Sequence, residues 1–171
     1  MNKMIGAASI LLASFLTALL RLRSKGERIL MLRSLETSLL SLRDELSERQ
    51  RSLGEVFQIL SRKNENRSVR AFYHSLYSGL ETLGERGFAE IWRETAEECF
   101  GGAGDKLCDA LFPLGGFLGG SELDRQCAAL DRAARSIGEL RHAEKDELRS
   151  ERKLNLALAL AAGAFLVIIL M

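Results

Sequence analysis

The last 18 residues of the chain, 154–171, contain no charged side chain, and their one strongly polar residue is Asn155. An α-helix of this length spans ~27 Å, close to the ~30 Å thickness of the hydrocarbon layer of a bilayer. A helix at the surface of a soluble core has a polar face, and this segment has none. We therefore predict a transmembrane helix over residues 154–171, in preference to a central helix of a soluble core.

A second uncharged run of 17 residues covers positions 4–20. A secretory signal peptide would have basic residues before its apolar stretch and a small-residue cleavage site after it. Here Lys3 alone precedes the run, and no Ala-x-Ala sequence follows it. We therefore predict a retained transmembrane helix over residues 4–20. At ~26 Å it is short, which leaves open whether it crosses the bilayer fully.

Basic residues lie on the inner side of both runs: Arg21, Arg23, Lys25, Arg28 and Arg33 after the first, and Arg141, Lys145, Arg149, Arg152 and Lys153 before the second. Loops on the cytoplasmic side of a membrane are enriched in Lys and Arg. This placement predicts a two-pass protein of the cell membrane, with residues 21–153 as a cytoplasmic helical domain and both termini across the membrane.

Composition restricts both the fold and the partners. The chain has 24 basic and 23 acidic residues, so its formal charge of +1 indicates no nucleic-acid partner. It has a single proline, Pro113, and is rich in good helix formers. We predict an all-α fold, a helical bundle with an N-terminal and a C-terminal transmembrane helix.

Apolar residues at helical spacing predict three consecutive helices in the cytoplasmic part. The first has the seam Leu22, Ile29, Leu32, Leu35, Leu39, Leu42, Leu46 and Leu53, with a bend indicated by Gly54. A polar break over residues 63–67 separates it from a second stripe of Val69, Phe72, Tyr73, Leu76, Leu80 and Leu83. A third short helix contains Phe88, Ile91, Trp92 and Ala96.

The sequence offers no strong candidate for catalysis or metal binding. The glycine-rich stretch 101–106 lacks the spacing and the preceding strand of a phosphate-binding loop, so we interpret it as a flexible connection with Asp105 as an N-cap. Cys99, Cys108 and Cys127 are interpreted as small apolar residues or free thiols, because they lack the spacing of metal ligands. His74 and His142 lie far apart in the sequence, so neither indicates a metal site. We expect no enzyme, no cofactor and no small-molecule substrate.

The most distinctive stretch of the cytoplasmic part covers residues 114–126. Gly115 and Gly119 lie four residues apart, so in a helix they share a face and permit close backbone contact. Glycines at 119 and 120 also favour the end of that helix, and Ser121 with Asp124 resembles a capping box that begins the next one. Nothing interrupts the pattern after it, which predicts one helix from about Ser121 into the C-terminal span.

These features together resemble the stage III sporulation protein AB family of endospore-forming bacteria, over essentially the whole chain. The resemblance rests on Leu114-Gly115-x-x-Leu118-Gly119 followed by Asp124-x-Gln126, on Trp92 in a middle helix, on Leu35-Glu36, and on the opening Lys3-Met4-Ile5-Gly6-Ala7 and the Lys153-Leu154 entry to the last span. The proline that such proteins often carry before Leu53 is absent here, and the glycine loop and the cysteines are local features. We expect Trp92, Leu114, Gly115, Leu118, Gly119, Asp124 and Gln126 to serve in helix packing or interaction.

The resemblance implies a membrane protein of the mother cell, in the channel-like, secretion-system-like complex that links it to the forespore. It also implies a cytoplasmic domain similar to the helical domain of the type II secretion platform protein. The implied partners are other channel proteins, including a cytoplasmic secretion-type ATPase. The chain would act as a platform or adaptor, and a homo-oligomer is left open. The alternative is a membrane-tethered sensor or signalling protein that dimerises as a coiled coil through the Leu22–Leu53 seam.

Overall fold

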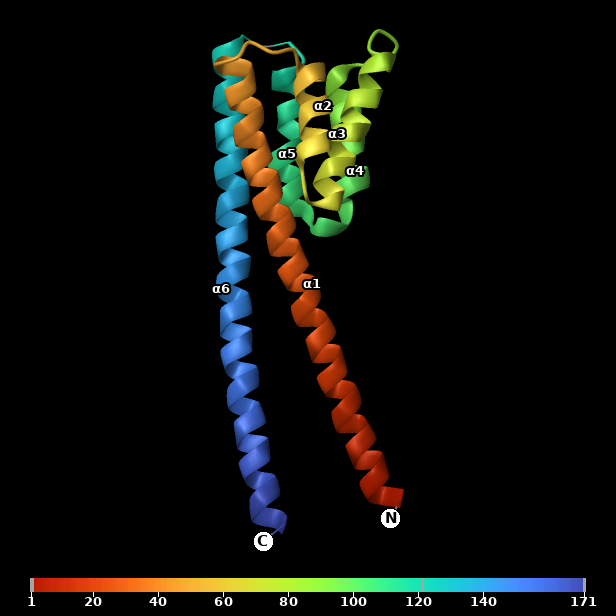
Figure 1. Ribbon diagram of the computed structural model, residues 1–171, viewed down its shortest axis with the longest axis vertical. Coiled ribbons are helices and arrows are strands. Elements are labelled where there is room, and N and C mark those ends of the chain that lie inside the picture. Colours follow the sequence, from red (N-terminus) through yellow and green to blue (C-terminus); the bar gives the residue numbers. More distant parts are fainter. Residues whose placement is uncertain (1, 121, 171) are drawn as a thin grey trace. The chain divides into compact units, whose positions relative to one another are not determined.

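The computed structural model describes the backbone of residues 2–120 and 122–170 and the side chains of residues 23–120, 122–154 and 157. Within these residues every regular element is a helix, which confirms the all-α prediction (Figure 1). The elements are α1 (Asn2–Ser47), α2 (Leu53–Lys63), α3 (Arg67–Gly79), the short 3-10 helix η1 (Leu80–Thr82), α4 (Phe88–Phe100), the 3-10 helix η2 (Gly101–Ala103), α5 (Asp105–Leu118) and α6 (Leu123–Leu170).

The chain divides into two compact units. Unit 1 consists of Met1–Glu27 with His142–Met171, and unit 2 consists of Arg28–Arg141. In unit 1, Lys25 Nζ lies 3.0 Å from Glu147 Oε1 and 2.5 Å from Glu151 Oε1. Hydrogen bonds to these two carboxylates raise the pKa of Lys25. These two ion pairs of Lys25 therefore join α1 to α6 within unit 1. The predicted division at residues 20 and 153 stays a prediction.

Among the residues that the structure describes, no helix is long and apolar enough to cross a membrane. The predicted span 4–20 lies wholly outside the residues whose side chains are described. Of the predicted span 154–171, only Leu154 and Ala157 have described side chains, and both are exposed.

The core of unit 2 forms where the leucine face of α1 meets an aromatic cluster. Leu32, Leu35, Leu39 and Leu42 are fully buried, and Leu46 is 6% exposed. The cluster consists of Phe57, Phe72, Tyr73, Phe88, Trp92 and Phe100, from α2, α3 and α4. The ring centroid of Phe72 lies 5.1 Å from those of Trp92 and Phe100. Edge-on and tilted packing of this kind suits the charge distribution of aromatic rings. Most residues of the predicted apolar stripes thus meet in one core, whereas Leu83, predicted in the second stripe, is 49% exposed beyond the end of α3.

Polar contacts fix the position of α1 against its neighbours in unit 2. The Ser38 hydroxyl donates to the Leu35 carbonyl, so the Tyr73 hydroxyl, 3.0 Å away, donates to Ser38. Towards α6, Arg141 Nε donates to Glu36 Oε2 over 2.8 Å. The glycine at 138 leaves room for this carboxylate, because a Cβ there would lie 2.8 Å from Glu36 Oε1. A second ion pair, Arg43 with Asp131, joins the same two helices over 2.7 Å.

The structure corrects two details of the sequence interpretation. The first helix ends at Ser47 instead of continuing to Leu53. Ser52 and Glu55 form a capping box that begins α2, with Glu55 N 3.4 Å from Ser52 Oγ and Ser52 N 3.1 Å from Glu55 Oε2. The second correction concerns Asp105, which is the first residue of α5; its N-cap is Gly104, at φ +96°. The carboxylate there faces the positive end of the helix dipole instead of capping it.

Truncation of the buried seam tests this packing. We expect Leu39→Ala to lower the free energy of unfolding by about 2–5 kcal/mol, because it leaves a cavity in the core. Leu30, 61% exposed on the same helix, is the matched control, and Leu30→Ala should change stability by less than about 0.5 kcal/mol. Denaturant titration of the full chain in detergent, followed by the fluorescence of its single tryptophan, measures both. Equal losses in the two variants would contradict the assigned seam.

Candidate interaction site

The glycines of the 114–119 motif bring α5 into close contact with α4. A Cβ built on Gly115 would lie 2.9 Å from the Trp92 Cβ and 3.0 Å from the Ala89 Cα. A Cβ on Gly119 would lie 3.1 Å from the Phe88 Cβ. Such separations are below ordinary van der Waals contact, so a side chain at Gly115 would force the helices apart. The close approach predicted from the glycine spacing is present.

Trp92 occupies the centre of this contact. Its side chain is fully buried, and its indole N–H donates to the Leu111 carbonyl of α5 over 2.8 Å. A buried indole N–H without an acceptor would lose the hydrogen bond that it makes to water, at a cost of about 1–3 kcal/mol. The bond therefore fixes both the depth and the rotation of α4 against α5.

The remaining motif residues connect α5 to the start of α6. Leu114 and Leu118 are each 2% exposed and belong to the core. Gln126 Nε2 lies 3.5 Å from the Leu118 carbonyl and so caps the end of α5 at long range. Asp124 is exposed in the first turn of α6, where a carboxylate stabilises the helix dipole. Ser121, predicted to begin a capping box with Asp124, lies outside the described residues.

The seven predicted residues thus divide into packing residues and surface residues. Trp92, Leu114, Gly115 and Leu118 are buried at the α4–α5 contact, and Gly119 approaches Phe88 at its edge. Phe117 occupies one of the variable positions of the motif. The guanidinium carbon of Arg132 in α6 lies over its ring, 5.6 Å from the ring centroid. Of the seven, Asp124 is the one that projects a charge to the surface. A partner could contact Asp124, whereas the buried residues act on a partner only by shaping the bundle.

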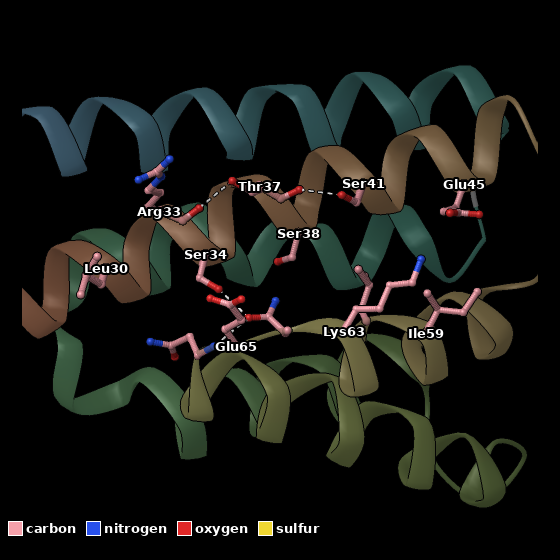
Figure 2. A pocket seen from close by; sticks show the side chains of 13 residues that line it. Leu30, Arg33, Ser34, Thr37, Ser38, Ser41, Glu45, Ile59, Lys63 and Glu65 are labelled. Carbon is pink, nitrogen blue, oxygen red and sulfur yellow. Dashed lines mark hydrogen bonds between the residues drawn. The ribbon is translucent and has the colours of Figure 1, made fainter.

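A groove in unit 2 offers a larger surface for interaction (Figure 2). It lies between α1 and the α2–α3 corner and has a volume of about 720 Å³. Its α1 wall carries Leu30, Arg33, Ser34, Thr37, Ser38, Ser41 and Glu45, and its other wall carries Ile59, Leu60, Lys63, Asn64, Glu65 and Asn66. The sequence analysis did not identify this surface. Its one signal is the set of small hydroxyl residues at positions 34, 37, 38 and 41, which fall on one side of a helix.

The hydroxyl groups of the groove are engaged inside the protein. Thr37 Oγ1 donates to the Arg33 carbonyl over 2.9 Å, and Ser41 Oγ donates to the Thr37 carbonyl over 3.0 Å. Ser34 Oγ donates to Asn64 Oδ1 over 2.5 Å, which ties the two walls together. The groove therefore presents small side chains whose donor protons are already used.

The cysteines and the possible metal ligands among the described residues form no reactive cluster. Burial raises the pKa of the thiols of Cys99, Cys108 and Cys127, with nearby carboxylates as smaller contributions, so these thiols stay protonated at neutral pH. Among the described residues, no three His, Cys, Asp or Glu side chains lie together as metal ligands would. His74 is exposed on α3.

Neighbouring glycines allow a matched test of the α4–α5 contact. We expect Gly115→Ala to destabilise the protein by about 1–3 kcal/mol, because the new methyl group meets Trp92 and the backbone of Ala89. Gly116 has nothing within 4 Å of its hypothetical Cβ, so Gly116→Ala should be neutral or stabilising by up to about 1 kcal/mol. Denaturant unfolding monitored by Trp92 fluorescence distinguishes them. A stabilising effect of both alanines would show that the glycine at 115 is not required for packing.

Comparison with known proteins places this bundle in a family. The family model of stage III sporulation protein AB matches residues 3–171. No curated protein and no solved structure matches the chain. The match extends over almost the whole sequence and includes the Leu-Gly-x-x-Leu-Gly segment, Trp92 and Gln126, whose packing is described above. The chain therefore belongs to the stage III sporulation protein AB family.

Proposed function

We propose that this protein is a two-pass, non-enzymatic membrane component of the channel-like complex between mother cell and forespore. In this proposal residues 4–20 and 154–171 cross the mother-cell membrane, and the helical bundle lies in the cytoplasm as a platform for partner proteins. A cytoplasmic secretion-type ATPase and other channel proteins are the proposed partners, as the resemblance implies. Membership of the stage III sporulation protein AB family supports a role in sporulating cells.

The observation that carries the proposal is the pairing of α1 and α6 in unit 1. Lys25 of α1 contacts both Glu147 and Glu151 of α6, and the two helices run antiparallel at this point (Figure 1). Both backbones continue as helix beyond the contact, α1 back to Asn2 and α6 on to Leu170. The two uncharged terminal segments therefore extend from the contact in the same direction. This arrangement supports two anchors that enter a bilayer from one face.

The charge pattern supports the same orientation. Arg23 and Lys25 follow the first uncharged segment, and Arg149, Arg152 and Lys153 precede the second. Of these, Arg23, Arg149, Arg152 and Lys153 are exposed. Cationic side chains at the cytoplasmic boundary are attracted by anionic lipids and oppose translocation. With both segments across the membrane, the bundle lies on the cytoplasmic side.

The burial of the α1 seam favours a platform over the alternative dimeric coiled coil. The coiled-coil model needs Leu32, Leu35 and Leu39 to contact a second copy, but all three are fully buried within this chain. Their surface is therefore not available to another molecule unless the bundle opens. The absence of clustered metal-ligand side chains among the described residues and the raised thiol pKa values give no support to an enzyme.

Reporter fusions at both termini test the topology. In a sporulating host, a reporter that is active only outside the cytoplasm should be active at either end, and a cytoplasmic reporter should be inactive at both. The variant Arg149→Glu/Arg152→Glu/Lys153→Glu should reduce insertion or change the orientation of the C-terminal segment, because acidic residues do not retain a flank in the cytoplasm. Cytoplasmic activity at both ends of the unaltered chain would contradict the two-pass proposal.

Co-purification tests the platform function separately. Full-length protein extracted in mild detergent from sporulating membranes should carry the secretion-type ATPase and other channel proteins with it. Gly115→Ala, which perturbs the bundle, should weaken this association more than Gly116→Ala does. Isolation of a clean monomer under the mildest conditions would contradict a platform function while leaving the topology intact.

A further inference from the structure

We propose that the groove between α1 and α2 binds an acidic amphipathic helix of a partner protein. This inference deepens the platform function proposed above and rests on it. It assigns a surface to the interaction, and it specifies the partner by shape and charge. The proposal uses residues of unit 2 alone.

The length and form of the groove suit a helix. Its α1 wall extends from Leu30 to Glu45, a rise of ~22 Å or about four helical turns. Ser34, Thr37, Ser38 and Ser41 follow one another along this wall at helical spacing, as Figure 2 shows. Small side chains let the backbone of a second helix approach closely, as the glycines do at the α4–α5 contact. A helix of about four turns would therefore occupy the groove along its whole length.

The surface chemistry of the groove suits an apolar helix face. Because Thr37 and Ser41 donate to carbonyls of their own helix, and Ser34 donates to Asn64, an apolar occupant leaves none of these donors unpaired. Leu30 is 61% exposed at one end of the groove, and Ile59, half-buried on the opposite wall, lies at the other end (Figure 2). These two side chains offer aliphatic contact at both ends of the groove. A partner helix would lay an aliphatic face along it, from one to the other.

The charges of the groove favour carboxylates on the edges of that face. Arg33 and Lys63 come from the two walls, and Lys63 extends from α2 towards α1 (Figure 2). Both are exposed, and neither forms an ion pair with any residue that the structure describes. Of the two acidic residues in the lining, Glu45 is paired with Arg49 and Arg51, over 3.0 and 2.9 Å. Glu65 is thus the one acid left to oppose two unpaired cations.

The basic character continues beyond the lining. Arg62 and Arg67 flank Lys63 at the α2–α3 corner, and both are exposed and without an ion pair among the described residues. The free charge at this corner is therefore positive. An acidic partner helix would complete these pairs, whereas a basic helix would be repelled.

Photo-cross-linking tests the assignment in the full chain within sporulating cells. A benzoylphenylalanine placed at Thr37 or Ser41 should form a cross-link to another protein of the channel complex, and mass spectrometry would identify the attached peptide. The peptide should lie in a helix with an aliphatic face bordered by Asp or Glu. The same probe at Glu98, exposed on α4 and outside the groove, should not attach to that peptide.

A charge-reversal pair tests the electrostatic part. Arg33→Glu/Lys63→Glu should reduce the cross-linked product from Thr37 by about tenfold or more, because two attractive contacts become repulsive. Lys106→Glu/Arg135→Glu is the matched control; it makes the same change in net charge at two exposed positions outside the groove, and it should leave the yield unchanged. Replacement of the facing carboxylates on the partner by Lys should restore the cross-linked product of the Arg33→Glu/Lys63→Glu variant.

Four outcomes would overturn the inference. Three of them are a cross-link to a second copy of this chain, a cross-link to lipid, and a partner peptide without acidic residues. The fourth is the absence of any cross-link although the probe-bearing protein is present in the cells at its normal level. If reporter fusions still place the bundle in the cytoplasm and co-purification still recovers channel proteins, the groove assignment fails and the proposed platform function stands. If co-purification also fails, the platform function fails with it.

Discussion

At Gly115 the backbone of α5 comes within contact distance of α4, and much of the bundle depends on that closeness. The indole of Trp92 can reach the Leu111 carbonyl only because no side chain at 115 separates the helices. With α4 at this depth, Trp92 contacts Phe72 edge-on, and Phe57 lies 6.3 Å from Phe88 by ring centroids. The aromatic cluster in turn supports the leucine face of α1. Loss of the close contact would therefore loosen several helices together.

Much of this arrangement could be predicted from local pattern, because apolar residues at helical spacing must be buried somewhere. The leucine seam from Leu32 to Leu46, the aromatic stripe of α3 and the glycine pair of α5 are all signals of this kind. The continuous α6 was predictable for the complementary reason that it has no proline and that its glycines stand singly among good helix formers. What the pattern could not supply was the partner of each face, since periodicity says only that a face is covered.

The features that sequence reasoning missed depend on backbone geometry or on distant residues. Helix α1 ends at Ser47 although Leu53 continues the seven-residue spacing of the leucines. The chain turns at Gln50, which adopts a left-handed φ of +50° although it is not a glycine, so its residue type gives no sign of the turn. The Ser52–Glu55 capping box is a local signal that could have located the break. Gly138 resembles an ordinary helix defect until Glu36, far away in the sequence, is placed against it. The groove depends on how α2 turns into α3, and no single segment encodes it.

Helix α1 within unit 2 has three faces with separate functions. Leu32, Leu35, Leu39 and Leu42 point into the core and supply most of the stabilisation, because burial of a leucine contributes about 1.5–3 kcal/mol. Glu36 and Arg43 pair with α6; partly exposed ion pairs contribute about 0–1 kcal/mol each, so they set the register of the helices more than their stability. The third face carries the hydroxyl residues of the groove, of which Thr37 is exposed. A partner helix could occupy that face without disturbing the other two, because none of these buried leucines and neither of the ion-paired residues lines the groove. Binding in the groove would therefore leave the core and the α1–α6 register intact, as a platform requires.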